Sequence, residues 1–240
     1  MTELSPSSNS IQLWLSTVDQ LTKTIEQATY KLLSVSEKDR FQSTHNQHKK
    51  REFIMGRALI RHALSQIFCM PETYWDFVEK SQAAPIVTNL PANCYFSLSH
   101  SHGFIVFAIA SSPIGIDIEN SDKQRDFHAL ADIFMNDEEI SAWVENRWSA
   151  DIFYRIWCAK EAYYKALPLQ QQVTKSLNKI AISELIKNSD SWQLLEYRVE
   201  SFVLAIVLKA KPEQVHYQSF PRVDYNAFFC KPIDTPILYL

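Results

Sequence analysis

The stretch FYRIWCAKEAYYKA at residues 153–166, together with IGIDIE at residues 114–119, determines how the fold of this chain is interpreted. Residues 153–166 contain no glycine or proline and consist mainly of good helix formers, so they predict a helix of about four turns. Along 114–119 isoleucine alternates with other residues, which is the period of a β-strand. Asp117 and Glu119 therefore share one face of that strand, and a helix packed over it would bring Glu161 close to both.

Three neighbouring carboxylates, with a lysine four residues beyond the third, indicate a bound cation. Glu161 and Lys165 lie on one face of the predicted helix. Crowded negative charges are costly unless they are neutralised, and oxygen ligands without softer donors favour Mg²⁺ over zinc. Mg²⁺ held in this way keeps positions for water and substrate phosphates, so the pattern indicates phosphate chemistry. Taken one at a time, the same residues are also typical of a solvated strand face and a surface ion pair.

The combination of these segments is more specific than either alone. IGIDIE, followed about forty residues later by WCAKEAYYK and preceded by FSLSH, resembles the 4'-phosphopantetheinyl transferase family, specifically its double-length, surfactin-synthetase-activating type. The resemblance runs from about Ser34 to Leu167. It implies an α/β (α+β) fold of two similar lobes in a pseudo-twofold arrangement, each with a small, mostly antiparallel sheet packed on a long helix. The active site would then lie between the lobes, and the chain would act as a monomer.

The resemblance also implies an activity, the Mg²⁺-dependent transfer of 4'-phosphopantetheine from coenzyme A to a serine of an apo acyl or peptidyl carrier protein, releasing 3',5'-ADP. By this resemblance Asp117, Glu119 and Glu161 hold the metal. Glu161, or a metal-bound water, takes the serine proton, and Lys165 stabilises charge on the transferring phosphate or leaving group. Lys160 is a further catalytic candidate that could instead orient the helix.

Contacts to coenzyme A are implied for a second set of residues, namely Arg40, Arg51, Ser99, His100 and Lys165. One departure concerns the same ligand. Many relatives carry Gly-Lys before a proline where this chain has Ala83 and Ala84 before Pro85. A lysine contact to phosphate is therefore missing, which leaves the phosphate contacts open but not the class of reaction.

Two other functions use similar residues. A metal-dependent phosphohydrolase would more often show additional His and Asp ligands for a second metal, and none is evident in the sequence. A non-catalytic carrier-binding protein of the same fold would leave the carboxylates solvated. The sequence does not identify the carrier protein or its pathway.

Composition and charge argue against several other classes of protein. The chain has 240 residues with a net charge of -3, which gives no basic footprint for nucleic acid. No run approaches the length of a membrane span, and the polar start is not a signal peptide, so a cytoplasmic location is expected. The four cysteines form no CxxC pair, so we expect neither a disulfide nor a zinc site. The three glycines exclude a glycine-rich phosphate loop.

Periodicity divides the chain into an N-terminal lobe at 1–112, a C-terminal lobe with the metal site at 113–211 and an extended tail at 212–240. We expect strands and helices in the order that follows: a strand at 11–18, helices at 19–33 and 49–68, strands at 74–80, 94–101, 103–110 and 114–119, helices at 127–148 and 153–166, and strands near 180–186, 192–199 and 201–208. A tight hairpin is expected at His102 and Gly103. The second half thus repeats the plan of the first.

Two helical faces allow more than one interpretation. In 49–68 Lys50, Arg57 and Arg61 share one side, which read alone is typical of a solvated basic face. In the other helix an apolar stripe recurs at helical spacing, formed by Phe127, Leu130, Ile133 and Phe134. It either faces the core or remains exposed to receive an amphipathic helix of the carrier protein.

Overall fold

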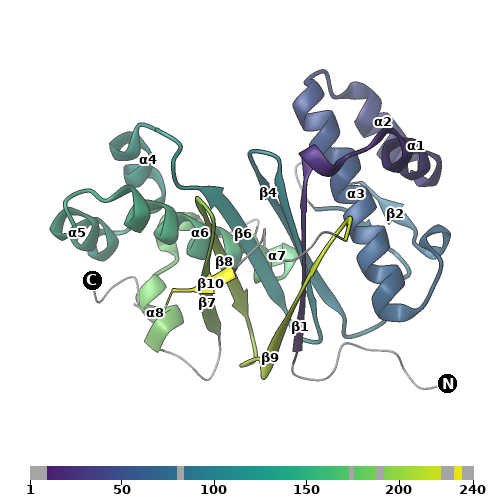
Figure 1. Ribbon diagram of the computed structural model, residues 1–240. Helices are drawn as coiled ribbons and strands as arrows, with labels where there is room; N and C mark the ends of the chain where they lie inside the picture. The colour runs from purple at the N-terminus through teal and green to yellow at the C-terminus, as the bar shows by residue number, and fades with distance from the viewer. Residues whose placement is uncertain (1–9, 80–83, 173–175, 188–191, 223–229, 234–240) are drawn as a thin grey trace. The chain divides into compact units, whose positions relative to one another are not determined.

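The structure is a computed structural model that describes residues 10–79, 84–172, 176–187, 192–222 and 230–233. The chain forms two compact units (Figure 1). The first consists of residues 1–111 with 213–224, and the second of residues 112–212 with 225–240. Each unit therefore combines one long segment of the chain with a short segment from the C-terminal part of the sequence.

The first unit begins with a strand and three helices. Their bounds are β1 Ser10–Thr17, the 3-10 turn η1 Val18–Gln20, α1 Lys23–Leu32, α2 Val35–Ser43 and α3 Gln47–Phe68. The side chain of Asn46 accepts a hydrogen bond from the amide of Lys49 and so caps the long helix α3. At its other end Cys69 adopts the left-handed conformation, which terminates the helix.

The first sheet has the strand order β4-β5-β1-β9. Its remaining strands are β4 Tyr95–Ser101, β5 Phe104–Ala110 and β9 Gln214–Ser219, and a separate ladder joins β2 Phe77–Val78 to β3 Ile86–Val87 after the turn η2 Glu72–Tyr74. The hairpin between β4 and β5 is the predicted one, because Ser101 pairs with Phe104 and only two residues connect them. His102 and Gly103 both have positive φ, 49° and 80°, as a two-residue hairpin turn requires.

The second unit contains most of the remaining helices. In chain order its elements are β6 Ile114–Asn120, α4 Phe127–Phe134, α5 Asp137–Glu145, α6 Ala150–Ala166, α7 Leu169–Gln172, η3 Leu177–Lys179, α8 Ile182–Lys187, β7 Gln193–Val199, β8 Phe202–Leu208 and β10 Cys230–Pro232. Its sheet has the order β10-β7-β8-β6, and all its neighbours pair antiparallel. Helix α6 packs on β6 and β8.

The two units share one plan, which confirms the predicted α/β class with two sheet-bearing lobes. In each unit a strand is followed by a long helix and then by a hairpin, and the last strand of the hairpin pairs with the opening strand of the unit. In the first unit these elements are β1, α3 and the hairpin β4–β5, with β5 paired to β1. In the second unit they are β6, α6 and the hairpin β7–β8, with β8 paired to β6. The central strands β5 and β8 are buried throughout, and one face of each long helix covers the sheet. The pseudo-twofold relation between the lobes stays a prediction.

Several segments differ from the expectation. The helical stretch at 127–148 consists of two helices, α4 and α5, and the strand expected at 74–80 is a strand only at Phe77–Val78. The predicted strand near 180–186 is wrong, because Ile182–Lys187 is the helix α8 and Leu177–Lys179 is a 3-10 turn. Ile182 and Leu185 are buried at helical spacing, and so short a run does not separate the two periods. The residues after 211, expected to be an extended tail, contain β9, which pairs parallel with β1, and β10, which pairs with β7. Within the described residues, no helix is long and apolar enough to cross a bilayer.

Candidate active site

A glycine lets helix α6 lie directly on strand β6. A Cβ atom at Gly115 would stand 1.9 Å from the carbonyl oxygen of Ala162 and 2.5 Å from the amide nitrogen of Ala166. No other residue fits without moving the helix backbone, because both obstacles are main-chain atoms. The contact brings the end of α6 that carries Glu161 and Lys165 against the face of β6 that carries Gly115 and the buried Asp117.

Asp117, Glu161 and Lys165 are brought together by this packing, as the sequence predicted. The Nζ atom of Lys165 donates to Oδ1 of Asp117 at 2.7 Å. Burial raises the pKa of Glu161, and the charges of Asp117 and Glu119 raise it further, although Lys165 opposes the shift. Burial alone would lower the pKa of Lys165, but Asp117 and Glu161 outweigh it and raise the pKa. The lysine therefore remains a cation among acids.

Glu119 has a cation of its own that the sequence analysis missed. Its Oε2 atom accepts from Nη2 of Arg125 at 3.2 Å. The guanidinium of Arg125 also lies over the rings of Tyr154 and Trp157, both on α6, at 5.8 and 5.6 Å from their centroids. These aromatic contacts hold the arginine beside the carboxylate. Asp117, Glu119, Glu161, Lys165 and Arg125 are called the carboxylate cluster below.

The carboxylate cluster fits a hard divalent cation by its donor chemistry. All three acids offer oxygen ligands, with no sulfur or imidazole nitrogen among them, as Mg²⁺ prefers. Among the residues that the structure describes, however, no three His, Cys, Asp or Glu side chains already have the geometry of metal ligands. The reason is visible in the pairing, since Asp117 is bonded to Lys165 and Glu119 to Arg125. A metal would compete with both cations.

Lys160 does not belong to this cluster. Its side chain is fully buried, and its Nζ atom lies 2.5 Å from Oε2 of Glu139 and donates to the carbonyl oxygens of Phe134 and Leu177 at 2.7 and 3.1 Å. Glu139 in turn caps α5 and accepts from the amide of Ile182. Lys160 thus ties α4, α5 and η3 to α6. Of its two expected roles, this geometry supports orientation of the helix and gives no access to a phosphate.

Three of the residues expected to contact coenzyme A surround the β4–β5 turn of the first unit. Nη2 of Arg51 donates to the carbonyl of Val18 at 3.0 Å, and the amide of Val18 donates to the carbonyl of Gly103 in the turn at 2.8 Å. His100, near the end of β4, is exposed, and Ser99 beside it is buried. The structure therefore brings Arg51 and the Ser99–His100 pair to the same end of the first unit.

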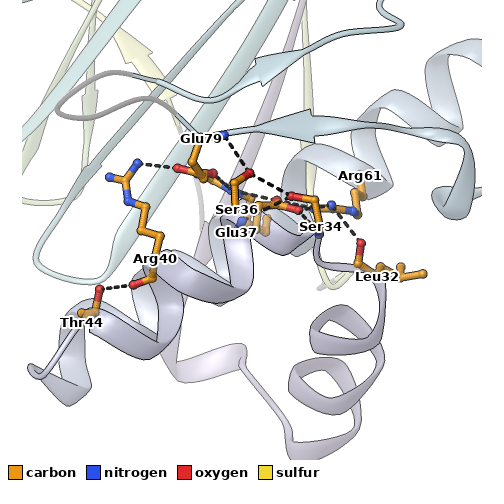
Figure 2. Close-up of polar contacts among 9 residues, drawn as sticks. Leu32, Ser34, Ser36, Glu37, Arg40, Thr44, Arg61 and Glu79 are labelled. Carbon is orange, nitrogen blue, oxygen red and sulfur yellow. Dashed lines mark hydrogen bonds and ion pairs between the residues drawn. The ribbon is translucent and has the colours of Figure 1, made fainter.

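Arg40 is engaged elsewhere, in a network of ion pairs shown in Figure 2. It donates to Glu79 at 2.5 Å, and Glu79 also accepts from Nε of Arg57 at 3.0 Å. Arg61 forms a two-point pair with Glu37, at 3.0 and 2.6 Å, and Nε of Arg57 lies 3.1 Å from the same carboxylate. Glu37, Arg57, Arg61 and Glu79 are called the arginine cluster below. Arg57 and Arg61 are buried, so the expectation of a solvated basic face is wrong for these two residues.

Comparison with known proteins relates this geometry to a family. A model described as the 4'-phosphopantetheinyl transferase superfamily matches residues 113–225, and one described as the 4'-phosphopantetheinyl transferase N-terminal domain matches residues 37–110. Together the two segments take in more than half of the chain. The chain belongs to the 4'-phosphopantetheinyl transferase superfamily. The superfamily match includes every member of the carboxylate cluster, and the N-terminal match includes every candidate contact of the first unit.

Individual members of the superfamily are similar over different lengths. The 4'-phosphopantetheinyl transferase psf-1 of Bacillus pumilus is 32% identical over 117 residues, 48% of this chain and 49% of that protein. The transferase Sfp of Bacillus subtilis strain 168 is 27% identical over 146 residues, 55% of this chain and 64% of that protein. The chain thus spans about half to two thirds of these relatives. The transferase HetI of a Nostoc species is 26% identical over 223 residues, 88% of this chain and 93% of that protein.

The sequence analysis missed three residues that shape these sites, namely Gly115, Arg125 and Glu52. The alternation along 114–119 gives Gly115 no role, although a glycine beside a packed helix signals close backbone approach. Arg125 lies six residues after Glu119 in a charged loop, with no spacing rule to connect them. Glu52 contacts His48. The two are four apart and are neighbours on α3, but α3 begins at Gln47, two residues before the predicted helix at 49–68.

The members of the apolar stripe considered for carrier binding differ in burial. Phe134 is buried in the core, and Phe127 and Leu130 are partly buried against it. Ile133 is 68% exposed and is the one member that offers its side chain to solvent. Any contact with a partner along this stripe would therefore depend on Ile133 rather than on Phe134.

Proposed function

We propose that this protein transfers the 4'-phosphopantetheine group of coenzyme A to a serine hydroxyl of an apo acyl or peptidyl carrier protein, releasing 3',5'-ADP, and that it acts as a monomer. The serine oxygen forms a bond to the phosphorus that carries the pantetheine arm, and the bond from that phosphorus to the bridging oxygen breaks. The observation that carries the proposal is the packing of α6 on β6, which places Glu161 and Lys165 beside Asp117.

In this proposal Asp117, Glu119 and Glu161 would hold Mg²⁺. When bound, Mg²⁺ would neutralise charge on the diphosphate, which is a large part of what phosphoryl transfer requires. Glu161 accepts the proton that leaves the serine hydroxyl. Its raised pKa brings the carboxylate nearer the range in which a general base is effective.

Lys165 supplies the fixed positive charge of the site. Its pKa is raised, so it remains an ammonium ion throughout the physiological range. It is partly exposed and bonded to Asp117, from which it can turn to an oxygen of the transferring phosphate. Stabilisation of negative charge as the bridging bond breaks is the role that this position supports.

Arg51, Ser99 and His100 are proposed to contact phosphate groups of coenzyme A in the first unit. Arg40 is a weaker candidate, because its guanidinium already pairs with Glu79 and an incoming phosphate would have to compete with that carboxylate. A lysine contact common among relatives is replaced here by alanine before Pro85. The remaining basic residues therefore carry a larger share of the phosphate recognition.

The test is direct transfer in vitro. The purified protein is incubated with coenzyme A, Mg²⁺ and several apo carrier proteins of the acyl and peptidyl classes, and the intact mass of each carrier is measured. We expect a carrier to gain the phosphopantetheine mass only when Mg²⁺ is present, and the same carrier with alanine at its acceptor serine to gain nothing.

The same assay separates the alternatives. A phosphohydrolase would consume coenzyme A without adding mass to any carrier. A non-catalytic carrier-binding protein would bind its partner without metal and leave coenzyme A intact. Either result, obtained across the carrier set with a folded protein, would contradict transfer.

A further inference from the structure

The carboxylate of Glu52 joins two histidines and a hairpin turn in the first unit. It lies 3.2 Å from Nε2 of His48 and 3.4 Å from Nδ1 of His100, and it accepts from the amide of Gly103 at 2.9 Å. Glu52 is 8% exposed, whereas the two imidazoles are 57% and 54% exposed. The acid is thus a buried anchor, and both rings extend from it into solvent.

The hydrogen-bond chemistry of these groups restricts what the rings can bind. An ionised carboxylate only accepts, so the ring nitrogen of His48 or His100 that faces Glu52 must carry hydrogen to bond to it. In a neutral imidazole the other nitrogen is then an acceptor, which repels a phosphate oxygen. Each ring can therefore donate to an anion on its solvent side only after it gains a second proton.

Glu52 stays charged while this happens. Burial alone would raise its pKa, but the hydrogen bond from His100, the amide of Gly103 and the charges of His100 and His48 lower the pKa to about 2. The other charged or titratable groups at this turn are Arg51, bonded to the Val18 carbonyl, and His102, whose Nδ1 lies 3.1 Å from the Ser101 hydroxyl.

Resting on the proposed function, we propose that His48 and His100 form a two-imidazole site for a phosphate group of coenzyme A, with Glu52 as the positioning residue that holds both rings. Coenzyme A then binds together with protons that the two imidazoles take up. His48 thereby becomes a contact residue, on a helix turn that precedes Arg51, and the hairpin turn is fixed to α3 through Gly103.

Calorimetry of coenzyme A binding tests this in buffers of different protonation enthalpy near pH 7, because the dependence on buffer gives the number of protons taken up. We expect proton uptake by the wild-type protein. His48→Gln should take up fewer protons and bind about ten-fold more weakly, as loss of one charge-assisted hydrogen bond implies. Glu52→Gln should show the same two changes although it does not touch the ligand. Neither change is expected for the matched control His62→Gln, an imidazole on the same helix that also faces a carboxylate, Glu72.

The phosphate is identified by repeating the titrations with dephospho-coenzyme A. A loss in His48→Gln that is confined to coenzyme A assigns the site to the 3'-phosphate, and equal losses assign it to the diphosphate. Should Glu52→Gln fail to fold, as judged by its melting temperature, His48→Gln carries the test alone.

The outcomes that overturn the inference are distinct from failure of the proposed function. Wild-type protein that does not bind coenzyme A contradicts the proposed function and the site with it. Wild-type protein that binds coenzyme A, with proton uptake equal to that of His48→Gln, contradicts the two-imidazole site alone.

Discussion

The arginine cluster of the first unit and the carboxylate cluster of the second are both built from charged side chains, but they are balanced differently. In the arginine cluster two buried guanidinium groups meet two carboxylates, and Glu79 also accepts from the more exposed Arg40, so no acid there is in excess. In the carboxylate cluster three acids meet two cations, and burial, together with the charges of the two other acids, raises the pKa of Glu161. Charge that is fully paired favours one fixed structure, whereas an excess of acid leaves affinity for a cation.

The largest expected effect is loss of transfer in Glu161→Gln. The substitution keeps the shape of the side chain but removes the proposed ligand charge and the proposed proton acceptor, so the rate should fall by about 10²-fold or more. The fold should survive, because one excess negative charge is removed from the carboxylate cluster. Mass-spectrometric transfer assays with circular dichroism measure both. Turnover close to that of the wild type would contradict the role given to Glu161.

The opposite pattern is expected in the arginine cluster for Glu37→Gln. Removing this acid leaves Arg57 and Arg61 buried with too little negative charge, which typically costs about 3 to 5 kcal/mol. Urea unfolding measures the loss, with Asp39→Asn, an exposed position on the same helix, as the control. A change below about 1 kcal/mol would mean that the arginine cluster is not a stabilising network.

A smaller effect, on both stability and transfer, is expected from Gly115→Ala. The added methyl group meets main-chain atoms of α6, and overpacking of this kind costs about 1 to 3 kcal/mol. The carboxylate cluster keeps its charges but loses its spacing. Gly56→Ala in α3 is the matched control, since its nearest atoms stand at 3.8 and 4.0 Å and the methyl group has room. Equal stability of the two variants in thermal unfolding would contradict the close helix contact.

The smallest expected effect concerns Arg125, which we expect to compete with a metal for Glu119. Arg125→Gln should bind Mn²⁺ a few-fold more tightly in the absence of coenzyme A, because a partly exposed ion pair is worth about 1 kcal/mol or less. Paramagnetic resonance of free Mn²⁺ measures this. The neighbouring exposed Lys123→Gln is the control. Weaker binding in Arg125→Gln would show that the arginine supports the metal site instead of competing with it.

The parts of the fold and site that followed from sequence were those with a local cause. Alternation in IGIDIE placed Asp117 and Glu119 on one strand face, and the absence of helix breakers placed Glu161 and Lys165 on a helix. The two-residue turn at His102 and Gly103 needed only the spacing of two apolar runs.

The parts that did not follow depend on partners distant in sequence. The side of α3 that carries Arg57 and Arg61 has the pattern of a solvated face, and only Glu37 and Glu79, about twenty residues away on either side, make it a buried one. Nothing near Lys160 in the sequence indicates that Glu139 neutralises it. Periodicity records which face is polar, but not whether that polarity meets water or an opposite charge.

The parallel pairing of β9 with β1 has a consequence for how the protein is made. β9 is an edge strand of the first sheet and lies next to β1, with Ser10 paired to Gln214. This edge is therefore completed only after some two hundred further residues have been synthesised. Until then β1 offers an unpaired row of amides and carbonyls on the side that β9 will cover, the kind of edge that invites pairing with other chains. Emergence from the ribosome is therefore the stage at which the first unit is most exposed to aggregation, and a chaperone that shields that strand would act in the interval before β9 arrives.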